Sequence, residues 1–149
     1  MSPSLASPVI VVHSLPQAVA VLQEAAKVGR AVTLLSAPGA GASAGPGWFG
    51  NVVAAARAEV PAARFTALLD CGDENGAALA AIRYGIEGIV FTGRADVAAR
   101  LADLAARQGA SLLTQRPRED LDLASEFFAD DERLHRRCAE FLATVTGIC

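Results

Sequence analysis

Two residues that can carry protons, His13 and Asp70, each stand where an apolar run of the sequence ends. His13 follows "VIVV" and Asp70 closes "FTALLD". Histidine and aspartate are common general acids and bases. If the strands that end in these residues were neighbours, the two side chains would lie close together, beside Ser14, Ser36 or Cys71. We therefore take His13 and Asp70 as the candidate catalytic residues, with a polar strand end as the alternative for His13.

The stretch "SAPGAGASAGPGWFG", Ser36 to Gly50, has the most biased composition in the chain. Glycines allow backbone N–H groups to approach an anion, and a following helix N-terminus offers further unpaired donors. The alternative is a plain connection between a strand and a helix, in which Trp48 only packs. The candidate ligand-binding residues in this stretch are Ser36, Gly39, Gly41, Gly45, Gly47 and Trp48.

Known phosphate-binding motifs do not match this stretch. The motif G-x-x-x-x-G-K-[ST] requires a lysine, and the only lysine of the chain is Lys27. The dinucleotide motif G-x-G-x-x-G fails because Gly45 comes one position late after Gly41 and because the loop follows the second apolar run. An unspecified anion site is what remains, and no cofactor can be named.

Polar residues also follow the fourth and fifth apolar runs. They are Thr92, Arg94 and Arg116, which we add to the ligand-binding candidates. In parallel sheets, ligands bind at the carboxyl ends of the strands. Asp73 and Glu74 near Asp70 suit helix capping better than Mg²⁺ binding, so we predict no metal site.

Asp70, Thr92 and the Arg116-Pro117 pair resemble the response-regulator receiver domains, a family with a phosphorylated aspartate, a threonine or serine and a Lys-Pro at the ends of three strands. The sequence departs from the family at His13-Ser14, where an acidic pair is expected, and at Arg116, which replaces the lysine. The resemblance implies a doubly wound five-stranded fold. A degenerate, non-catalytic receiver-like homodimer is therefore our alternative function.

Five short apolar runs alternate with helical patterns along the chain, and they are nearly continuous in hydrophobicity. Such runs are typical of strands buried on both faces of a parallel sheet. The predicted strands are Val9–Ser14, Ala31–Ala37, Phe65–Cys71, Gly88–Gly93 and Ala110–Gln115. The predicted helices follow Ser14 up to Gly29, and then cover Trp48–Val60, Asn75–Tyr84, Asp96–Gln108 and a final segment from Ser125 or Asp131 to Thr146.

These elements predict one α/β domain, a five-stranded parallel sheet with helices on both faces as in flavodoxin-like and Rossmann-like three-layer sandwiches, plus an extra C-terminal helix. Residues 1–117 form the βα domain. Residues 118–149 form a surface linker and a helix that packs on the same domain or on a partner subunit. The length of 149 residues is too short for a complete eight-stranded barrel, although a half-barrel completed by a second chain is conceivable.

The bulk composition narrows the classes of partner. The net charge of −3 argues against nucleic acid and anionic lipid as partners, and no apolar run is long enough to cross a membrane. The N-terminus lacks the features of a signal peptide, and Cys71, Cys138 and Cys149 form no disulfide or zinc pattern. We expect a cytoplasmic homo-oligomer, a dimer, that binds a small phosphate- or carboxylate-bearing ligand. Whether it is an enzyme stays open.

Overall fold

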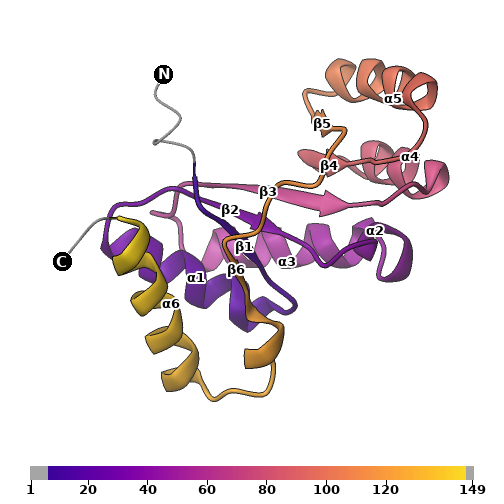
Figure 1. The fold of residues 1–149 in the computed structure, drawn as a ribbon. Coiled ribbons are helices and arrows are strands. Elements are labelled where there is room, and N and C mark those ends of the chain that lie inside the picture. Colours follow the sequence, from indigo (N-terminus) through magenta and orange to yellow (C-terminus); the bar gives the residue numbers. More distant parts are fainter. Residues whose placement is uncertain (1–6, 147–149) are drawn as a thin grey trace.

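Six parallel strands form one sheet in the computed structural model, which describes residues 7–146 (Figure 1). The strands are β1 (Val9–Val11), β2 (Val32–Leu35), β3 (Phe65–Asp70), β4 (Gly88–Val90), β5 (Ser111–Leu113) and β6 (Leu121–Asp122). The helices are α1 (Leu15–Lys27), α2 (Ala40–Ser43), α3 (Pro46–Glu59), α4 (Asn75–Tyr84), α5 (Ala95–Arg107), the 3₁₀ helix η2 (Leu123–Glu126) and α6 (Asp131–Val145). The expected α/β class with a parallel sheet is confirmed.

The strands lie in the order β5-β4-β3-β2-β1-β6, so β1 to β5 are neighbours in the order of the chain. Right-handed crossovers that always step in the same direction place every connecting helix on the same face. The helices indeed contact one another in one series, α6 with α1, α1 with α3, α3 with α4 and α4 with α5. Strands β1 to β5 thus follow one another as the strands of a (β/α)₈ barrel wall do, whereas β6 lies beside β1 rather than beside β5.

This order corrects the expected three-layer sandwich with helices on both faces. Flavodoxin-like, Rossmann-like and receiver-like sheets reverse direction at a switch point, whereas β2 separates β1 from β3 here. The resemblance to receiver domains therefore does not extend to the topology. The second face of the sheet carries its own apolar cluster, built from Val11, Leu35, Leu68 and Val90 with Val9 and Leu113, and no helical residue belongs to it.

The sixth strand was not expected, because residues 116–122 read as a surface linker. Residues 114–120, which we call the crossing segment, run from the end of β5 over the helix-free face to β6 (Figure 1). There the backbone N–H of Asp120 donates to the carbonyl of Val9, and β6 pairs with β1 through Ile10–Leu121 and Val11–Asp122. The strand count is therefore six rather than five.

Local signals in the sequence place most helix ends correctly. Ser14 is the N-cap of α1, where its hydroxyl accepts from the Gln17 N–H. α3 begins at Pro46, two residues before the predicted start at Trp48. The predicted helix start at Asp96 is one residue late, because α5 begins at Ala95 with Arg94 as its N-cap and Asp96 lies in the first turn. There Asp96 pairs with the Arg94 guanidinium instead of capping the backbone.

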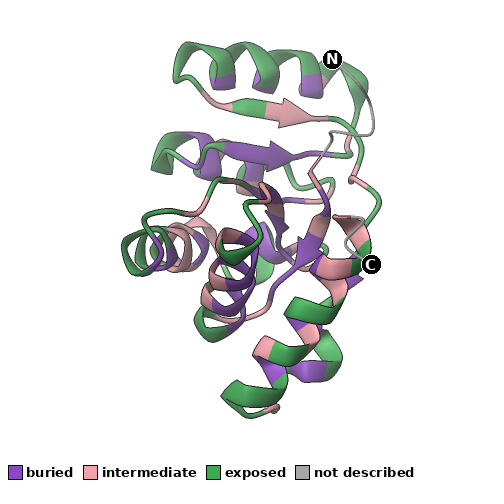
Figure 2. Cartoon of the chain, turned by 90° about the vertical axis from the view of Figure 1, so that its left-hand side faces the viewer, coloured by how far each residue is buried: buried purple, intermediate pink, exposed green. Residues whose placement is uncertain are grey.

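The final helix α6 uses its apolar stripe within the chain. Leu134, Cys138 and Leu142 are buried in one cluster with residues of α1, and Phe141 and Val145 pack against that cluster. Figure 2 shows this division of each helix into a buried and an exposed side. Among residues 7–146, no helix has the length and apolar character needed to cross a bilayer. The predicted N-terminal tail, up to residue 6, and Cys149 lie outside the described residues.

Candidate functional site

The carboxyl ends of the strands bring polar side chains to the helix-free face of the sheet. Val11, Leu35 and Leu68 are paired across β1, β2 and β3 and belong to the cluster on that face. Side chains two residues apart share a face of a strand, so Asp70 follows Leu68 on this face, and His13 comes two residues after Val11, just beyond the end of β1. Asp70 pairs with Val90, which belongs to the same cluster. We call His13 and Asp70, together with the charged residues Asp122, Arg116 and Glu119 that pair with them, the rim.

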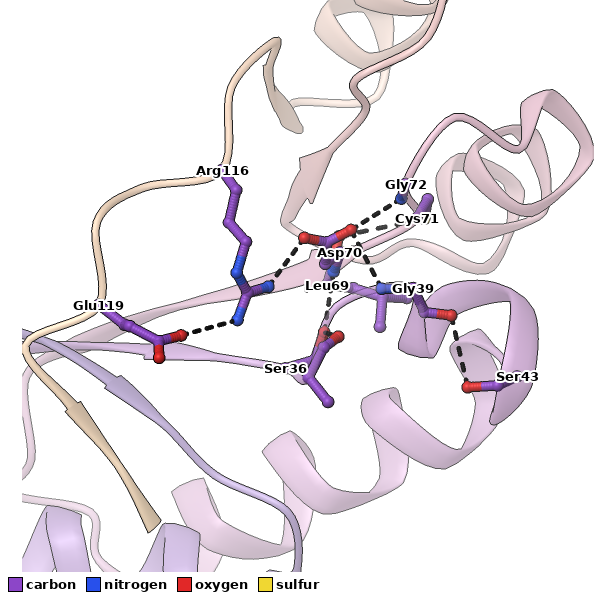
Figure 3. Close-up of polar contacts among 10 residues, drawn as sticks. Ser36, Gly39, Ser43, Leu69, Asp70, Cys71, Gly72, Arg116 and Glu119 are labelled. Atoms are coloured by element: carbon purple, nitrogen blue, oxygen red, sulfur yellow. Dashed lines mark hydrogen bonds and ion pairs between the residues drawn. The ribbon is translucent and has the colours of Figure 1, made fainter. Parts of the chain in front are cut away.

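Asp70 is the best-anchored member of the rim (Figure 3). Its side chain is 5% exposed, and its Oδ1 accepts from the N–H groups of Gly72 at 2.7 Å and Gly39 at 3.3 Å. Its own N–H donates to Ser36 Oγ at 2.9 Å. The two backbone donors hold the carboxylate in one orientation, with Oδ2 directed away from them.

Arg116 reaches this oxygen from the crossing segment. Its Nη1 donates to Asp70 Oδ2 at 2.8 Å, and its Nη2 lies 3.3 Å from Oε2 of Glu119 (Figure 3). The two partners differ in their surroundings, because Asp70 is buried while the Glu119 side chain is 43% exposed. Arg116 itself is 20% exposed. Asp70 thus fixes the guanidinium, and Glu119 occupies its outer edge.

His13 pairs with a different carboxylate from the one expected. Strand β2 lies between β1 and β3, so His13 and Asp70 end strands that are two places apart, about 10 Å at the usual strand spacing. The His13 Nε2 instead lies 2.7 Å from Asp122 Oδ1 at the end of β6. The strands that end in His13 and Asp70 are not neighbours, and the hydrogen-bonded partner of His13 is Asp122.

Asp122 and Glu119 are the rim residues that sequence reasoning missed. Both lie in the segment that was taken for a linker. Asp122 also accepts the N–H of Ala124 at the start of η2, a capping role that its position before an apolar residue could have indicated. Nothing in the local sequence of Glu119 separates it from the other charged residues around it.

The glycine-rich stretch is an ordered structure that contains the short helix α2. Gly39 and Gly45, which flank this helix, have φ values of +70° and +92°, which side chains other than glycine rarely adopt. A Cβ on Gly41 would lie 2.5 Å from Cys71 Sγ, so this glycine permits close packing of α2 on β3. Ser36 is fully buried and its hydroxyl donates to the Ala37 carbonyl. Gly41 and Ser36 therefore have structural roles that keep them from a ligand.

The remaining ligand-binding candidates are spread around the rim. Gly47 and Trp48 lie in the first turn of α3, where Trp48 is half-buried against the core and 6.1 Å from the ring of Phe49. Thr92 is exposed after β4, and its N–H donates to the Gly72 carbonyl at 2.7 Å. Arg94 is 81% exposed and paired with Asp96. Neither Thr92 nor Arg94 makes a hydrogen bond or ion pair with Arg116 among the described residues.

Cys71, next to Asp70, is held in its thiol form. Burial and the negative charge of Asp70 raise the pKa of Cys71 to about 11. A thiolate is the nucleophilic form of cysteine, and its population at neutral pH is very small at this pKa. Cys71 therefore serves as a packing residue under Gly41 rather than as a nucleophile.

Comparisons with known proteins address the fold. No family model matches the chain, and no curated protein does. Among solved structures, it is similar to the crystal structure of a "putative fructose-1,6-biphosphate aldolase" from Coccidioides immitis, with a TM-score of 0.59 and 18% identity. The match covers 73% of this chain and 40% of that one, so the chain spans less than half of the aldolase's length. The likeness shows a shared α/β fold.

Proposed function

We propose that this protein binds a small carboxylate- or phosphate-bearing molecule at the rim, with Arg116 as its main cationic contact. The observation that carries the proposal is the difference between the two partners of Arg116. The inner edge of the guanidinium is bound to the buried Asp70 at 2.8 Å, and the outer edge is bound to the exposed Glu119 at 3.3 Å.

An exposed ion pair contributes little free energy, whereas arginine binds carboxylates and phosphates with two parallel hydrogen bonds. An incoming anion can therefore displace Glu119 from Nη2 while Asp70 keeps the guanidinium in place. Gly39 and Gly72 support this role, because their N–H groups hold the Asp70 carboxylate from the opposite side. Asp70 is a positioning residue in this proposal.

His13 is the second contact that we propose. Its Nε2 is engaged by Asp122 at 2.7 Å, and its Nδ1 has no hydrogen-bond partner within residues 7–146. A carboxylate partner fixes the orientation and tautomer of an imidazole. The free nitrogen can donate to the ligand or exchange a proton with it. The backbone N–H groups at the start of α3, from Gly47 and Trp48, add donors at the same carboxyl end of the strands.

The proposal is tested by titrating inorganic phosphate, sugar phosphates and 2-oxo acids while following Trp48 fluorescence and the melting temperature. A ligand that binds the folded protein raises the melting temperature in a saturable way. Arg116→Gln should weaken binding by about tenfold or more, the loss of a charge-assisted hydrogen bond. Glu119→Gln should strengthen binding by about twofold to fivefold, because the competing carboxylate is removed.

Arg107→Gln is the matched control, because Arg107 is an exposed arginine paired with Asp103 on α5. This variant should bind like the wild type. A panel that gives no saturable response in either readout would refute the proposal, and so would a ligand whose affinity is the same in the wild type and in Arg116→Gln.

A second candidate function is self-association, which a different observation favours. Phe127 and Phe128 are 50% and 94% exposed and form an edge-to-face pair with ring centroids 5.0 Å apart. Adjacent exposed aromatic side chains are enriched at contacts between proteins. Sedimentation of the wild type and of Phe128→Ala separates the two cases: a dimer that Phe128→Ala dissociates supports this function, and a monomeric wild type excludes it.

A further inference from the structure

The amino-terminal half of the helix-free face contains a hollow that the rim does not use. Its volume is about 500 Å³, and it spans the sheet from β1 to β5. The helices cover only the other face, and the crossing segment contributes just one wall of the hollow, at Pro117. Sites for small organic molecules typically have volumes of about 300–1,000 Å³.

The lining of the hollow combines apolar and hydroxyl side chains. The apolar part comes mainly from Val9, Leu68 and Leu113. The hydroxyls come from Ser7, Thr33, Thr66 and Ser111. Thr33 and Thr66 are paired between β2 and β3, with their Oγ1 atoms 3.2 Å apart. One hydroxyl of that pair keeps its proton free for another acceptor, and Ser111 Oγ has no partner among the described residues.

Charge is nearly absent from the lining residues that the structure describes. The ionisable residue that contributes to it is Glu87, at the edge, whose carboxylate accepts from Arg57 Nη2 at 2.8 Å. A ligand carboxylate or phosphate that entered the hollow would lose its hydration without gaining a cationic partner from these lining residues. Burial of an unpaired charge has a large free-energy cost. An uncharged molecule with an apolar body would instead bury its surface against the leucines and the valine.

Gly88 makes room for this lining in the middle of the sheet. It lies on β4 opposite Ser111, and a Cβ at this position would come within 2.5 Å of Leu68 Cδ2. Glycine inside a strand often marks a place where another group approaches the backbone closely. The Leu68 side chain packs against the backbone of Gly88, and the apolar surface of the hollow therefore extends across β3 and β4.

We propose that this hollow is a second binding site, for an uncharged amphipathic molecule with an apolar body and one hydroxyl or carbonyl group. The hydroxyls of Thr33, Thr66 and Ser111 bind the polar group, and Val9, Leu68 and Leu113 contact the apolar body. The site lies toward the amino ends of the strands and shares no residue with the rim, so it is independent of the function proposed above.

The test uses benzyl alcohol as the neutral probe and benzoate as its charged counterpart, with amide chemical shifts of the full chain as the readout. Benzyl alcohol should shift the amides of Thr33, Thr66 and Ser111 along one saturable curve. Benzoate should bind there about tenfold more weakly, because its carboxylate lacks a cationic partner.

Two substitutions at Thr66, an exposed lining residue on β3, separate filling the space from removing the hydroxyl. Thr66→Trp fills the hollow and should abolish binding. Thr66→Val keeps the shape and should weaken binding by about fivefold, the loss of one neutral hydrogen bond. Thr144→Val is the control, because Thr144 is an exposed threonine on α6. Should Thr66→Trp fail to fold, Ser111→Trp fills the hollow from β5.

Shifts that do not saturate, or that are equal for benzoate and benzyl alcohol, would overturn the proposal. Equal binding by the wild type and by a folded tryptophan variant would overturn it as well. Binding at the rim is read from Trp48 fluorescence with anions, and binding in the hollow from the amides of Thr33, Thr66 and Ser111 with benzyl alcohol. A failure of the rim proposal and a failure of this one are therefore distinguishable.

Discussion

Arg116 Nη1 donates to Asp70 Oδ2 at 2.8 Å and so joins residues that are 46 positions apart in the chain. Asp70 ends β3, and Arg116 belongs to the crossing segment, which has no helical or strand structure. The pair therefore attaches the crossing segment to the sheet. The same contact positions the guanidinium that we propose as the anion contact.

Loss of this pair should destabilise the fold. Asp70→Asn leaves the half-buried Arg116 without its inner carboxylate, and we expect the free energy of unfolding to fall by about 2–4 kcal/mol, as for other buried pairs that lose one partner. Urea unfolding measures this change. Glu119→Gln removes only the exposed partner and should cost less than about 1 kcal/mol. Equal costs for the two variants would contradict the difference between inner and outer partners.

Gly41→Ala should be destabilising in spite of its helical position. The new Cβ would lie 2.5 Å from Cys71 Sγ and 3.2 Å from the Asp70 carbonyl oxygen, and such overpacking costs about 1–3 kcal/mol. Gly76→Ala is the matched control on α4, where a Cβ meets no atom within 4 Å. That control should stabilise by up to about 1 kcal/mol. Thermal unfolding of both variants gives the comparison, and a neutral Gly41→Ala would contradict close packing of α2 on β3.

Glu24 should make stability depend on pH in the acid range. Burial raises its pKa, but hydrogen bonds from His135 at 2.6 Å and Lys27 at 2.9 Å outweigh burial and hold the pKa below the ordinary value of 4.5. A pKa lowered by folding means that the carboxylate stabilises the protein above pH 4.5 and that this contribution is lost as the pH falls through the lowered pKa.

The variant Glu24→Gln should therefore be less stable than the wild type by roughly 2 kcal/mol near pH 6, with the difference shrinking below pH 4.5. Urea midpoints between pH 7 and pH 3 measure it. Glu132→Gln, at a glutamate that is 88% exposed on α6, should show no such trend. A difference for Glu24→Gln that is constant over the whole range would contradict the role of its charge.

The two described cysteines should react slowly in the folded protein. Burial raises the pKa of Cys71 to about 11, together with the charge of Asp70, and burial together with Glu24 raises the pKa of Cys138 to about 12. In a Cys149→Ser background, alkylation by iodoacetamide at pH 8 should be about 100-fold slower than in urea, since only the thiolate reacts. Labelling of either cysteine at the unfolded rate would contradict this placement.

The sequence predicts the elements of this fold better than their arrangement. Ser14 and Pro46 mark helix starts through their own backbone and side-chain chemistry, so they can be recognised locally. The order of the strands depends on which pairs bury the most surface, which no local pattern records. The two-residue strand β6 is stabilised by its pairing with β1, and its sequence "LD" carries no strand signal.

The rim was predictable in its type and only partly in its members. Asp70, His13 and Arg116 could be found because polar residues at the ends of apolar strands are readily seen. The partners of His13 and Arg116 could not, because Asp122 and Glu119 come from a segment whose path across the sheet is fixed by tertiary contacts. The glycine-rich stretch was ambiguous because backbone conformation and close packing select glycine as strongly as anion binding does.

The most direct test of the central proposal is an NMR titration that observes the Arg116 side-chain Nε–H and the His13 ring with the tightest-binding anion of the panel. The account predicts that both signals shift along one saturation curve. It also predicts that Glu119→Gln moves this curve to lower ligand concentration. An anion that binds with a saturable rise in melting temperature but leaves both side chains unperturbed would contradict the account.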